Sequence, residues 1–142
     1  MPIMPIMLLY LLPYIYYEFA VQNWANATYQ IHGLWPAYSH GKYPSWCNGT
    51  EYKNVTGAQY DDMQRYWNSD NDNQAFWGHE WTKHGTCMQQ QTNITQDQYF
   101  DTALDIFKNL ISENTTWTCG ATDDCIVACY DLMLKNESCP TK

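Results

Sequence analysis

The chain has few charged residues and very few basic ones. Only 15% of its 142 residues are charged, and 7 Lys and Arg stand against 15 Asp and Glu, which gives a net charge of −8. This balance excludes the broad basic surface with which proteins coat duplex nucleic acid. A polyanion could be held here only by a local cluster of cationic side chains.

The sequence also lacks the features that divide a chain into several parts. It contains no Gly/Ser-rich linker, no block of like charges and no internal repeat. Its apolar content of 45% and aromatic content of 16% exclude a disordered tail and suffice for a core that needs no metal or cofactor. We therefore expect a single domain over residues 17–142.

Residues 1–16 are apolar and uncharged, but they lack the basic start and the small-residue cleavage site of a signal peptide. The run is too short and too often interrupted by proline for a stable membrane span. Two interpretations stay open, namely a degraded or truncated signal sequence that runs directly into a strand, or an artefactual start.

The six cysteines include no CxxC pair of the kind that begins many zinc sites. Disulfides are expected instead, and six cysteines can pair in 15 ways. Six Asn-x-Ser/Thr sequons add the prospect of N-glycosylation. Both features indicate a secreted protein or one of an acidic vacuolar or lysosomal compartment. The candidate glycosylation sites are Asn26, Asn48, Asn54, Asn93, Asn114 and Asn136.

Strand and helix patterns are mixed along the chain. Residues 17–24 alternate and predict a strand, and residues 28–34 predict a second strand that ends at Pro36. Residues 125–134 read as a buried strand. Since the strands and helices do not alternate regularly, the expected class is α+β.

Three helices are predicted between these strands. Thr56 and Gln59 resemble a capping box before a helix that extends to about residue 67. Residues 75–84 read as a short helix, with Gly85 as its stop. Thr95 and Gln98 form a second capping box ahead of the clearest amphipathic helix, over residues 99–111.

Three of the four histidines lie in two short aromatic segments, IHGLWP at 31–36 and FWGHEWTKHGTC at 76–87. On an α-helix, at about 100° per residue, His79, Glu80, Lys83 and His84 share one arc. Such an arc is costly to bury without a purpose, and the aromatic neighbours favour a cleft. A zinc protease does not fit, because its two histidines must be four residues apart and these are five apart.

Without a metal, this set of side chains suits cleavage of a phosphodiester by the substrate's own 2′-OH. The reaction needs a base for the 2′-OH, an acid for the 5′-oxygen and cations for the phosphate oxygens. Histidine can fill both proton-transfer roles and lysine supplies fixed charge. The need for a 2′-OH makes RNA the substrate and excludes cleavage of DNA.

The two histidine segments, in this order and about 45 residues apart, resemble the two active-site signatures of the ribonuclease T2 family. These are secreted acid endoribonucleases. The resemblance implies an antiparallel sheet flanked by helices. It also implies metal-independent cleavage of single-stranded RNA through a 2′,3′-cyclic phosphate, without a cofactor. We further expect a monomer.

The resemblance assigns roles residue by residue. It makes His32 the general acid for the leaving oxygen and His84 the base for the 2′-OH. Glu80 and Lys83 would stabilise the pentacovalent phosphorus, and His79 would bind phosphate. Three aromatic side chains resemble the family's base-stacking platforms, namely Trp35, Tyr38 and Phe76. The disulfides implied are Cys47–Cys87, Cys129–Cys139 and, for the remaining pair, Cys119–Cys125.

The chain also departs from the family pattern. Residues 111–119 are too short for the second helix and further strand that the family has there, so the fold is expected to be partly truncated. Part of the wall around the cleft would then be missing. An alternative function is therefore a catalytically weak or dead relative that acts as a secreted binding protein. A secreted glycan binder is a third hypothesis, although it leaves the arc of ionisable groups unexplained.

Overall fold

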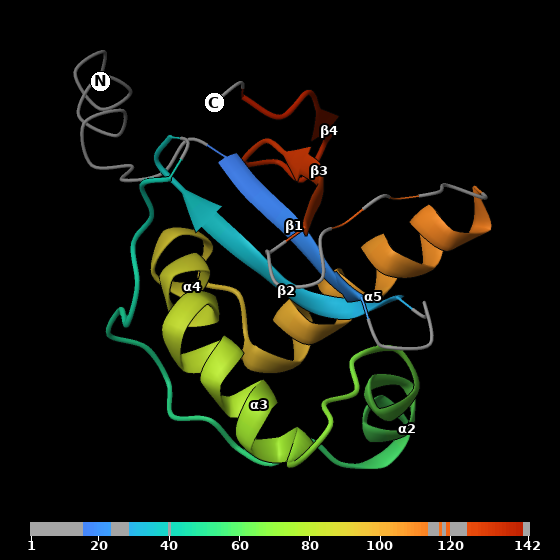
Figure 1. Ribbon diagram of the computed structural model, residues 1–142. Coiled ribbons are helices and arrows are strands. Elements are labelled where there is room, and N and C mark those ends of the chain that lie inside the picture. The colour runs from blue at the N-terminus through green and yellow to red at the C-terminus, as the bar shows by residue number, and fades with distance from the viewer. Residues whose placement is uncertain are drawn as a thin grey trace.

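A four-stranded antiparallel sheet runs through the molecule in the order β2-β1-β3-β4 (Figure 1). The computed structural model describes residues 16–23, 29–39, 41–113, 117, 119 and 125–140. The strands are β1 (Tyr16–Asn23), β2 (Tyr29–Ala37), β3 (Cys125–Tyr130) and β4 (Asn136–Glu137). The α+β class and the antiparallel sheet are as expected. Strand β1 begins at Tyr16, which pairs with Ala37 of β2.

The sequence predicted that the second strand ends at Pro36. Strand β2 instead continues through Pro36 to Ala37. A proline lacks the amide hydrogen of the ladder and is tolerated where a strand lies at the edge of its sheet. Strand β2 is such an edge strand, and Pro36 lies opposite Tyr17 in the register of β1.

The pairing of β1 with β2 contains a bulge. Ala20 lies opposite Gly33 and Val21 lies opposite Ile31, so that His32 is the extra residue between two successive pairs. A bulge changes the direction of the bulged side chain and is frequent beside active sites. The position of His32 is therefore set by an irregularity that strand alternation alone does not reveal.

The helices lie to one side of the sheet in the view of Figure 1. They are α2 (Gly57–Tyr66), α3 (Asn73–Glu80), the π-helical turn η1 (Trp81–Gly85), α4 (Thr86–Thr92) and α5 (Gln96–Ser112). The predicted helix at residues 99–111 and its Thr95–Gln98 capping box are confirmed. The other proposed box is wrong, because the Gln59 side chain donates to Asp97 and Asp101 of α5 instead.

The prediction that Gly85 stops the helix is also wrong. The helix that contains the second histidine segment continues from Asn73 to Thr92 through α3, η1 and α4. Gly85 has helical backbone angles, φ −63° and ψ −36°. A Cβ atom there would lie 2.3 Å from the Trp81 ring, so glycine serves close packing at this position.

The predicted strand over residues 125–134 ends earlier, at Tyr130. The carboxylate of Asp131 accepts hydrogen bonds from the backbone N–H groups of Met133 and Lys135. This side-chain acceptor closes a turn, which returns the chain as β4.

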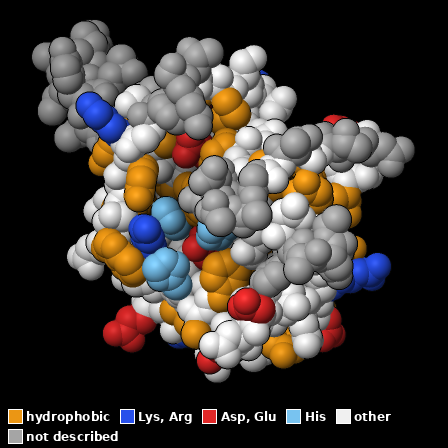
Figure 2. All heavy atoms as spheres, in the orientation of Figure 1, with side chains coloured by type: hydrophobic (Ala, Val, Ile, Leu, Met, Phe, Trp, Pro, Cys, Tyr) orange, Lys and Arg blue, Asp and Glu red, His pale blue; other side chains and the backbone are white. Residues whose placement is uncertain are grey.

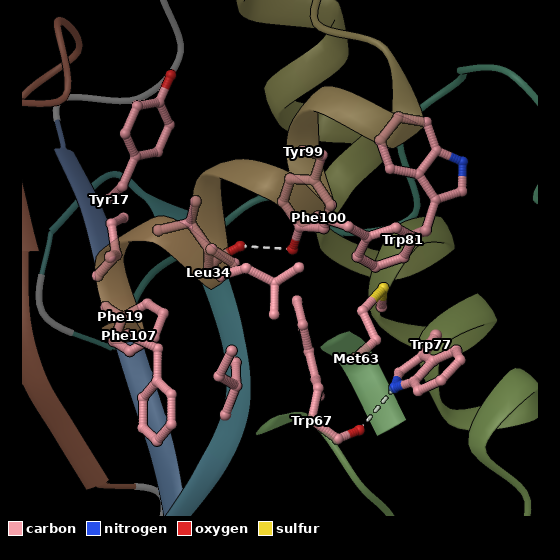
Figure 3. Close-up of a cluster of buried hydrophobic side chains, with 14 of the residues drawn as sticks. Tyr17, Phe19, Leu34, Met63, Trp67, Trp77, Trp81, Tyr99, Phe100 and Phe107 are labelled. Carbon is pink, nitrogen blue, oxygen red and sulfur yellow. Dashed lines mark hydrogen bonds between the residues drawn. The ribbon is translucent and has the colours of Figure 1, made fainter. Parts of the chain in front are cut away.

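The core consists mainly of aromatic side chains between the sheet and the helices, as the close-up in Figure 3 shows. The Tyr99 hydroxyl of α5 donates to the Leu34 carbonyl of β2 at 2.7 Å. The Trp77 indole of α3 donates to the Trp67 carbonyl at 2.6 Å. Buried polar tips are thus satisfied by backbone carbonyls, and these bonds fix α3 and α5 relative to the segment that carries His32.

Several sequence predictions lie outside the described residues. These concern residues 1–15 and the sequons at Asn26 and Asn114. Among the residues that are described, no helix is long and apolar enough to cross a membrane.

Candidate active site

His32 and Glu80 face each other across the junction of β2 and α3. The His32 Nε2 atom lies 4.0 Å from Glu80 Oε2, and the two side chains are 26% and 2% exposed. The Trp67 indole donates to the His32 carbonyl at 3.0 Å and anchors the bulge from behind. Phe76 of α3 also contacts the His32 imidazole, with ring centroids 5.9 Å apart.

The Glu80 carboxyl group is held by Trp35. The Trp35 Nε1–H donates to Glu80 Oε1 at 2.8 Å, in a buried hydrogen bond that joins the two histidine segments. Gly33 leaves the room for this bond, because a Cβ atom there would lie 2.2 Å from both bonded atoms. A buried carboxyl group needs such a donor, since leaving it unsatisfied is costly.

The π-helical turn brings His84 into the same site. The Thr86 N–H donates to the carbonyl of Trp81, five residues back. This wider turn reduces the angular separation of residues five apart, which a regular α-helix would place about 140° apart. The sequence predicted an ordinary α-helix here. Because of the π-turn, the angle about the helix axis between His79 and His84 is smaller than that prediction implies. Single π-turns of this kind are frequent at functional sites.

His84 is buried against Trp35. The two rings stack with centroids 5.0 Å apart and an interplanar angle of 29°. The imidazole is only 5% exposed, and its Nδ1 atom has no hydrogen-bond partner among the described residues. Burial, followed by the charges of Lys83, His79 and His32, lowers the pKa of His84 from 6.5 to about 3. His84 is therefore a neutral imidazole throughout the mildly acidic range, which is the form that a general base requires.

His79 and Lys83 lie nearer the surface. His79 is exposed, and its ring meets Trp46 edge to face at 5.4 Å. Partial burial and the charge of Lys83 lower the pKa of His79. The Lys83 ammonium lies 5.7 Å from the centroid of the Tyr43 ring, in cation–π geometry. Lysine is thus the permanent cation of the site, and His79 gains its charge only in more acidic solution.

The expected aromatic platforms have different environments. Trp35 is 9% exposed, stacks on His84 and donates to Glu80, so little of its surface is accessible. Tyr38 is 38% exposed, and Phe76 is half-buried beside His32. The sequence did not single out Tyr43, which lies 6.0 Å from His84, or Trp46. Both residues lie in an aromatic-rich loop that ends at Cys47, and this sequence feature could have indicated them.

These side chains share one face of the molecule. Figure 2 shows histidine side chains gathered beside basic and acidic side chains, with hydrophobic side chains around them. The site therefore contains His32, His79, Glu80, Lys83 and His84, which come from β2, α3 and η1. Among the described residues, no group of three or more His, Cys, Asp or Glu is arranged to hold a metal ion.

Three disulfides have the pairings that the resemblance implied, Cys47–Cys87, Cys119–Cys125 and Cys129–Cys139. The first closes a 40-residue separation and ties the loop with Tyr43 and Trp46 to α4, directly after the π-helical turn η1. It therefore fixes the loop beside the site.

Replacement of Cys47 by serine is expected to reduce the free energy of unfolding by about 2–5 kcal/mol, the usual loss for a disulfide of a small secreted domain. It also leaves Cys87 as a free thiol. Urea unfolding and thiol titration measure the two effects. Two titratable thiols at Cys47 and Cys87 in the native, unmutated protein would contradict the pairing.

The asparagines of the four described sequons are all exposed. Asn48, Asn54 and Asn93 are exposed. Asn136 is also exposed, and its side-chain amide donates to the Cys129 carbonyl at 3.2 Å.

Comparison with known proteins agrees with this geometry. Residues 16–122 match the model of the Ribonuclease T2 family. Ribonuclease T2 of Aspergillus oryzae is 32% identical over 116 residues, which cover 68% of this chain and 42% of that protein. Ribonuclease 1 of Arabidopsis thaliana is 38% identical over 86 residues, covering 56% of this chain and 36% of that one.

The chain thus spans less than half the length of these two curated relatives. Among solved structures, the Japanese pear S3-RNase has a TM-score of 0.69 at 18% identity, and the match covers 90% of this chain and 92% of that one. That likeness concerns the fold alone. Because the family model covers most of the chain, including both histidine segments, the chain belongs to the ribonuclease T2 family.

Proposed function

We propose that the protein is a metal-independent endoribonuclease that cleaves single-stranded RNA through a 2′,3′-cyclic phosphate. One observation carries the proposal, namely that Trp35 contacts both His32 and His84 at ring-centroid distances of 5.0 Å. Both imidazoles thereby contact the same buried indole, one edge to face and one stacked, which suits an acid and a base that act on one phosphate. Family membership supports ribonuclease activity in general.

In the first step, neutral His84 removes the proton of the 2′-OH, and the 2′-oxygen attacks the phosphorus. The bond from phosphorus to the 5′-oxygen breaks, and protonated His32 gives that oxygen its proton. The products are a 2′,3′-cyclic phosphate and a free 5′-OH. In the second step water takes the place of the 5′-OH, and the two histidines exchange roles.

The charged neighbours act on the phosphate oxygens. Lys83 supplies a positive charge to the pentacovalent state, and His79 adds a donor at the exposed side of the site. Glu80 lies within 4.0 Å of His32 and orients it. A protonated Glu80 can also donate to a phosphoryl oxygen. These interactions strengthen as charge develops in the transition state, which is the condition for catalysis.

Release of acid-soluble nucleotides from yeast RNA in the presence of EDTA tests the proposal. An active enzyme releases them with and without the chelator and leaves DNA intact, because DNA lacks the 2′-OH. A dead relative that only binds, or a glycan-binding protein, releases none. A metal-dependent nuclease stops when EDTA is added, and either result would refute the proposed function.

The pH dependence of kcat/KM follows from the two histidines. Because the pKa of His84 is lowered to about 3, the rising limb is expected well below pH 4.5 and not near the ordinary 6.5 of imidazole. The falling limb is assigned to the acid His32, and the optimum is expected below neutral pH.

Lys83→Met provides the matched test of this pH profile. Lys83 is one of the charges that lower the pKa of His84, so its loss should move the rising limb to higher pH, whatever happens to kcat. Lys42→Met is the control, since Lys42 is an exposed loop residue. Profiles of kcat/KM on a dinucleotide from pH 3 to 8 decide it, and an optimum above pH 7.5 would contradict the assigned roles.

The proposed setting is the secretory route, as a secreted protein or one of an acidic vacuole or lysosome. The three disulfides and the exposed sequons support it. The acidic optimum suits the same compartments.

A further inference from the structure

Trp46 is exposed in a way that the fold does not require. Its side chain is 56% exposed, although tryptophan is among the most costly side chains to leave in water. Its backbone has φ +53°, in the left-handed region that bulky residues rarely adopt. Strained residues of this kind are concentrated at ligand-binding sites, where the surrounding structure holds them in place.

Two neighbours hold Trp46 beside the catalytic turn. Its backbone N–H donates to the Lys83 carbonyl at 2.9 Å. The next residue, Cys47, is bonded to Cys87 of α4. An indole on a loop fixed at two adjacent points loses little conformational freedom when a ligand stacks on it, which is what a preorganised platform requires.

The orientation of Trp46 leaves one face of the indole open. Its contact with His79 is T-shaped, with an interplanar angle of 79°. Such a contact uses at most one face of the ring. The other face is available to a nucleobase, and every base can stack there because each has a π-face.

The positions of the acid and the base define which end of the RNA lies at Trp46. The acid His32, which protonates the 3′-side leaving group, contacts Phe76 at 5.9 Å. The base His84, which serves the nucleotide on the 5′ side of the cleaved bond, lies beside Tyr43 at 6.0 Å. Trp46 follows Tyr43 on the same loop and lies next to His79.

We infer that Trp46 is a stacking platform for the nucleobase immediately 5′ of the cleaved dinucleotide unit, so that the site accommodates at least three nucleotides. The inference rests on the proposed ribonuclease function for the direction of the RNA. Tyr43 lies nearer the base of the cleaved nucleotide itself, and Trp46 extends the aromatic track by one position.

Substrates with a single ribonucleotide test the inference, because only that sugar has a 2′-OH and the cleaved bond is thereby fixed. The three substrates are the dinucleotide rU-dA, the 5′-extended dA-rU-dA and the 3′-extended rU-dA-dA. The unmutated protein should show a kcat/KM about 5- to 10-fold higher on the 5′-extended substrate than on the dinucleotide.

Trp46→Ala should abolish this gain and leave the dinucleotide rate within about twofold. Trp46→Phe should restore most of it, because a phenyl ring also stacks. Ser45→Ala, at the exposed neighbouring position, is the matched control and should retain the full gain. The inference is overturned if the 5′ extension gives no gain, if Trp46→Ala lowers the dinucleotide rate equally, or if only the 3′-extended substrate responds.

A binding measurement separates this inference from the proposed function. An all-deoxy trinucleotide with 2-aminopurine as its 5′ base is not cleaved, and stacking quenches its fluorescence. Quenching that Trp46→Ala removes and Ser45→Ala retains supports the platform, even if no substrate is cut and the ribonuclease proposal fails. Equal quenching in both variants would overturn the platform.

Discussion

Replacement of His84 by alanine is expected to lower kcat/KM on a dinucleotide by about 10²–10⁴-fold, the usual contribution of a general acid–base group. The variant lacks the neutral imidazole that is proposed to accept the 2′-OH proton. His32→Ala should cause a loss of the same order, because it removes the acid for the 5′-oxygen.

The double variant should lose little more than either single one. The two histidines are proposed to act as a unit. Loss of either one already prevents concerted proton transfer, so loss of the second has little further effect on the rate. His79→Ala is the control within the same arc and should mainly raise KM, since it binds phosphate without transferring a proton. A near-normal rate for either His32→Ala or His84→Ala would refute the assigned roles.

The buried state of His84 also makes a prediction about stability that is independent of turnover. In the unfolded chain the imidazole binds a proton near pH 6.5, and in the folded protein only near pH 3. Unfolding therefore takes up a proton between these values, and the free energy of unfolding falls as the pH falls from about 6.5 to about 3. Above pH 6.5 the imidazole is neutral in both states, so His84 no longer makes the free energy of unfolding depend on pH.

His84→Gln should flatten that slope, because glutamine does not titrate. Urea unfolding of the two proteins at pH 4 and pH 7 measures the difference. If the variant and the unmutated protein lose stability equally between these pH values, His84 is not the buried neutral base described here.

Gly33→Ala is expected to have the second large effect. The new Cβ atom would lie 2.2 Å from both Trp35 Nε1 and Glu80 Oε1, so that their hydrogen bond cannot persist. Overpacking and an unsatisfied buried carboxyl group should together reduce the free energy of unfolding by about 2–4 kcal/mol. Activity should fall by at least about 10²-fold, because Trp35 positions both histidines.

Trp35→Phe separates the hydrogen bond from the bulk of the ring. It retains an aromatic surface for His84 and removes the indole N–H, so activity should fall while the backbone at Gly33 is unchanged. Unfolding curves and kcat/KM for both variants are the measurements. Full activity in Gly33→Ala would show that the contact between the two histidine segments is unnecessary for function.

Sequence periodicity located most elements because their hydrophobic faces are regular. The strand predicted from residue 17 and the helix predicted behind Thr95 are both present, as β1 and α5. The helix buries one regular face against the core, whereas β1 is buried on both of its faces. Predictions from local sequence patterns were wrong where a side chain forms its hydrogen bonds with residues far away in the sequence. Gln59, for example, bonds to Asp97 and Asp101 instead of the backbone at Thr56.

By itself, the sequence determined which chemical groups this protein can use. Its two histidine segments contain the proposed acid, the proposed base and the lysine, because residue identity and spacing are local properties. Only the tertiary structure decided how these groups act. The bulge orients His32, and the π-turn contains His84. The buried hydrogen bond between Trp35 and Glu80 joins the two segments, because these residues are 45 positions apart. The burial that lowers the pKa of His84 likewise arises from neighbours brought together by packing, and no local pattern encodes it.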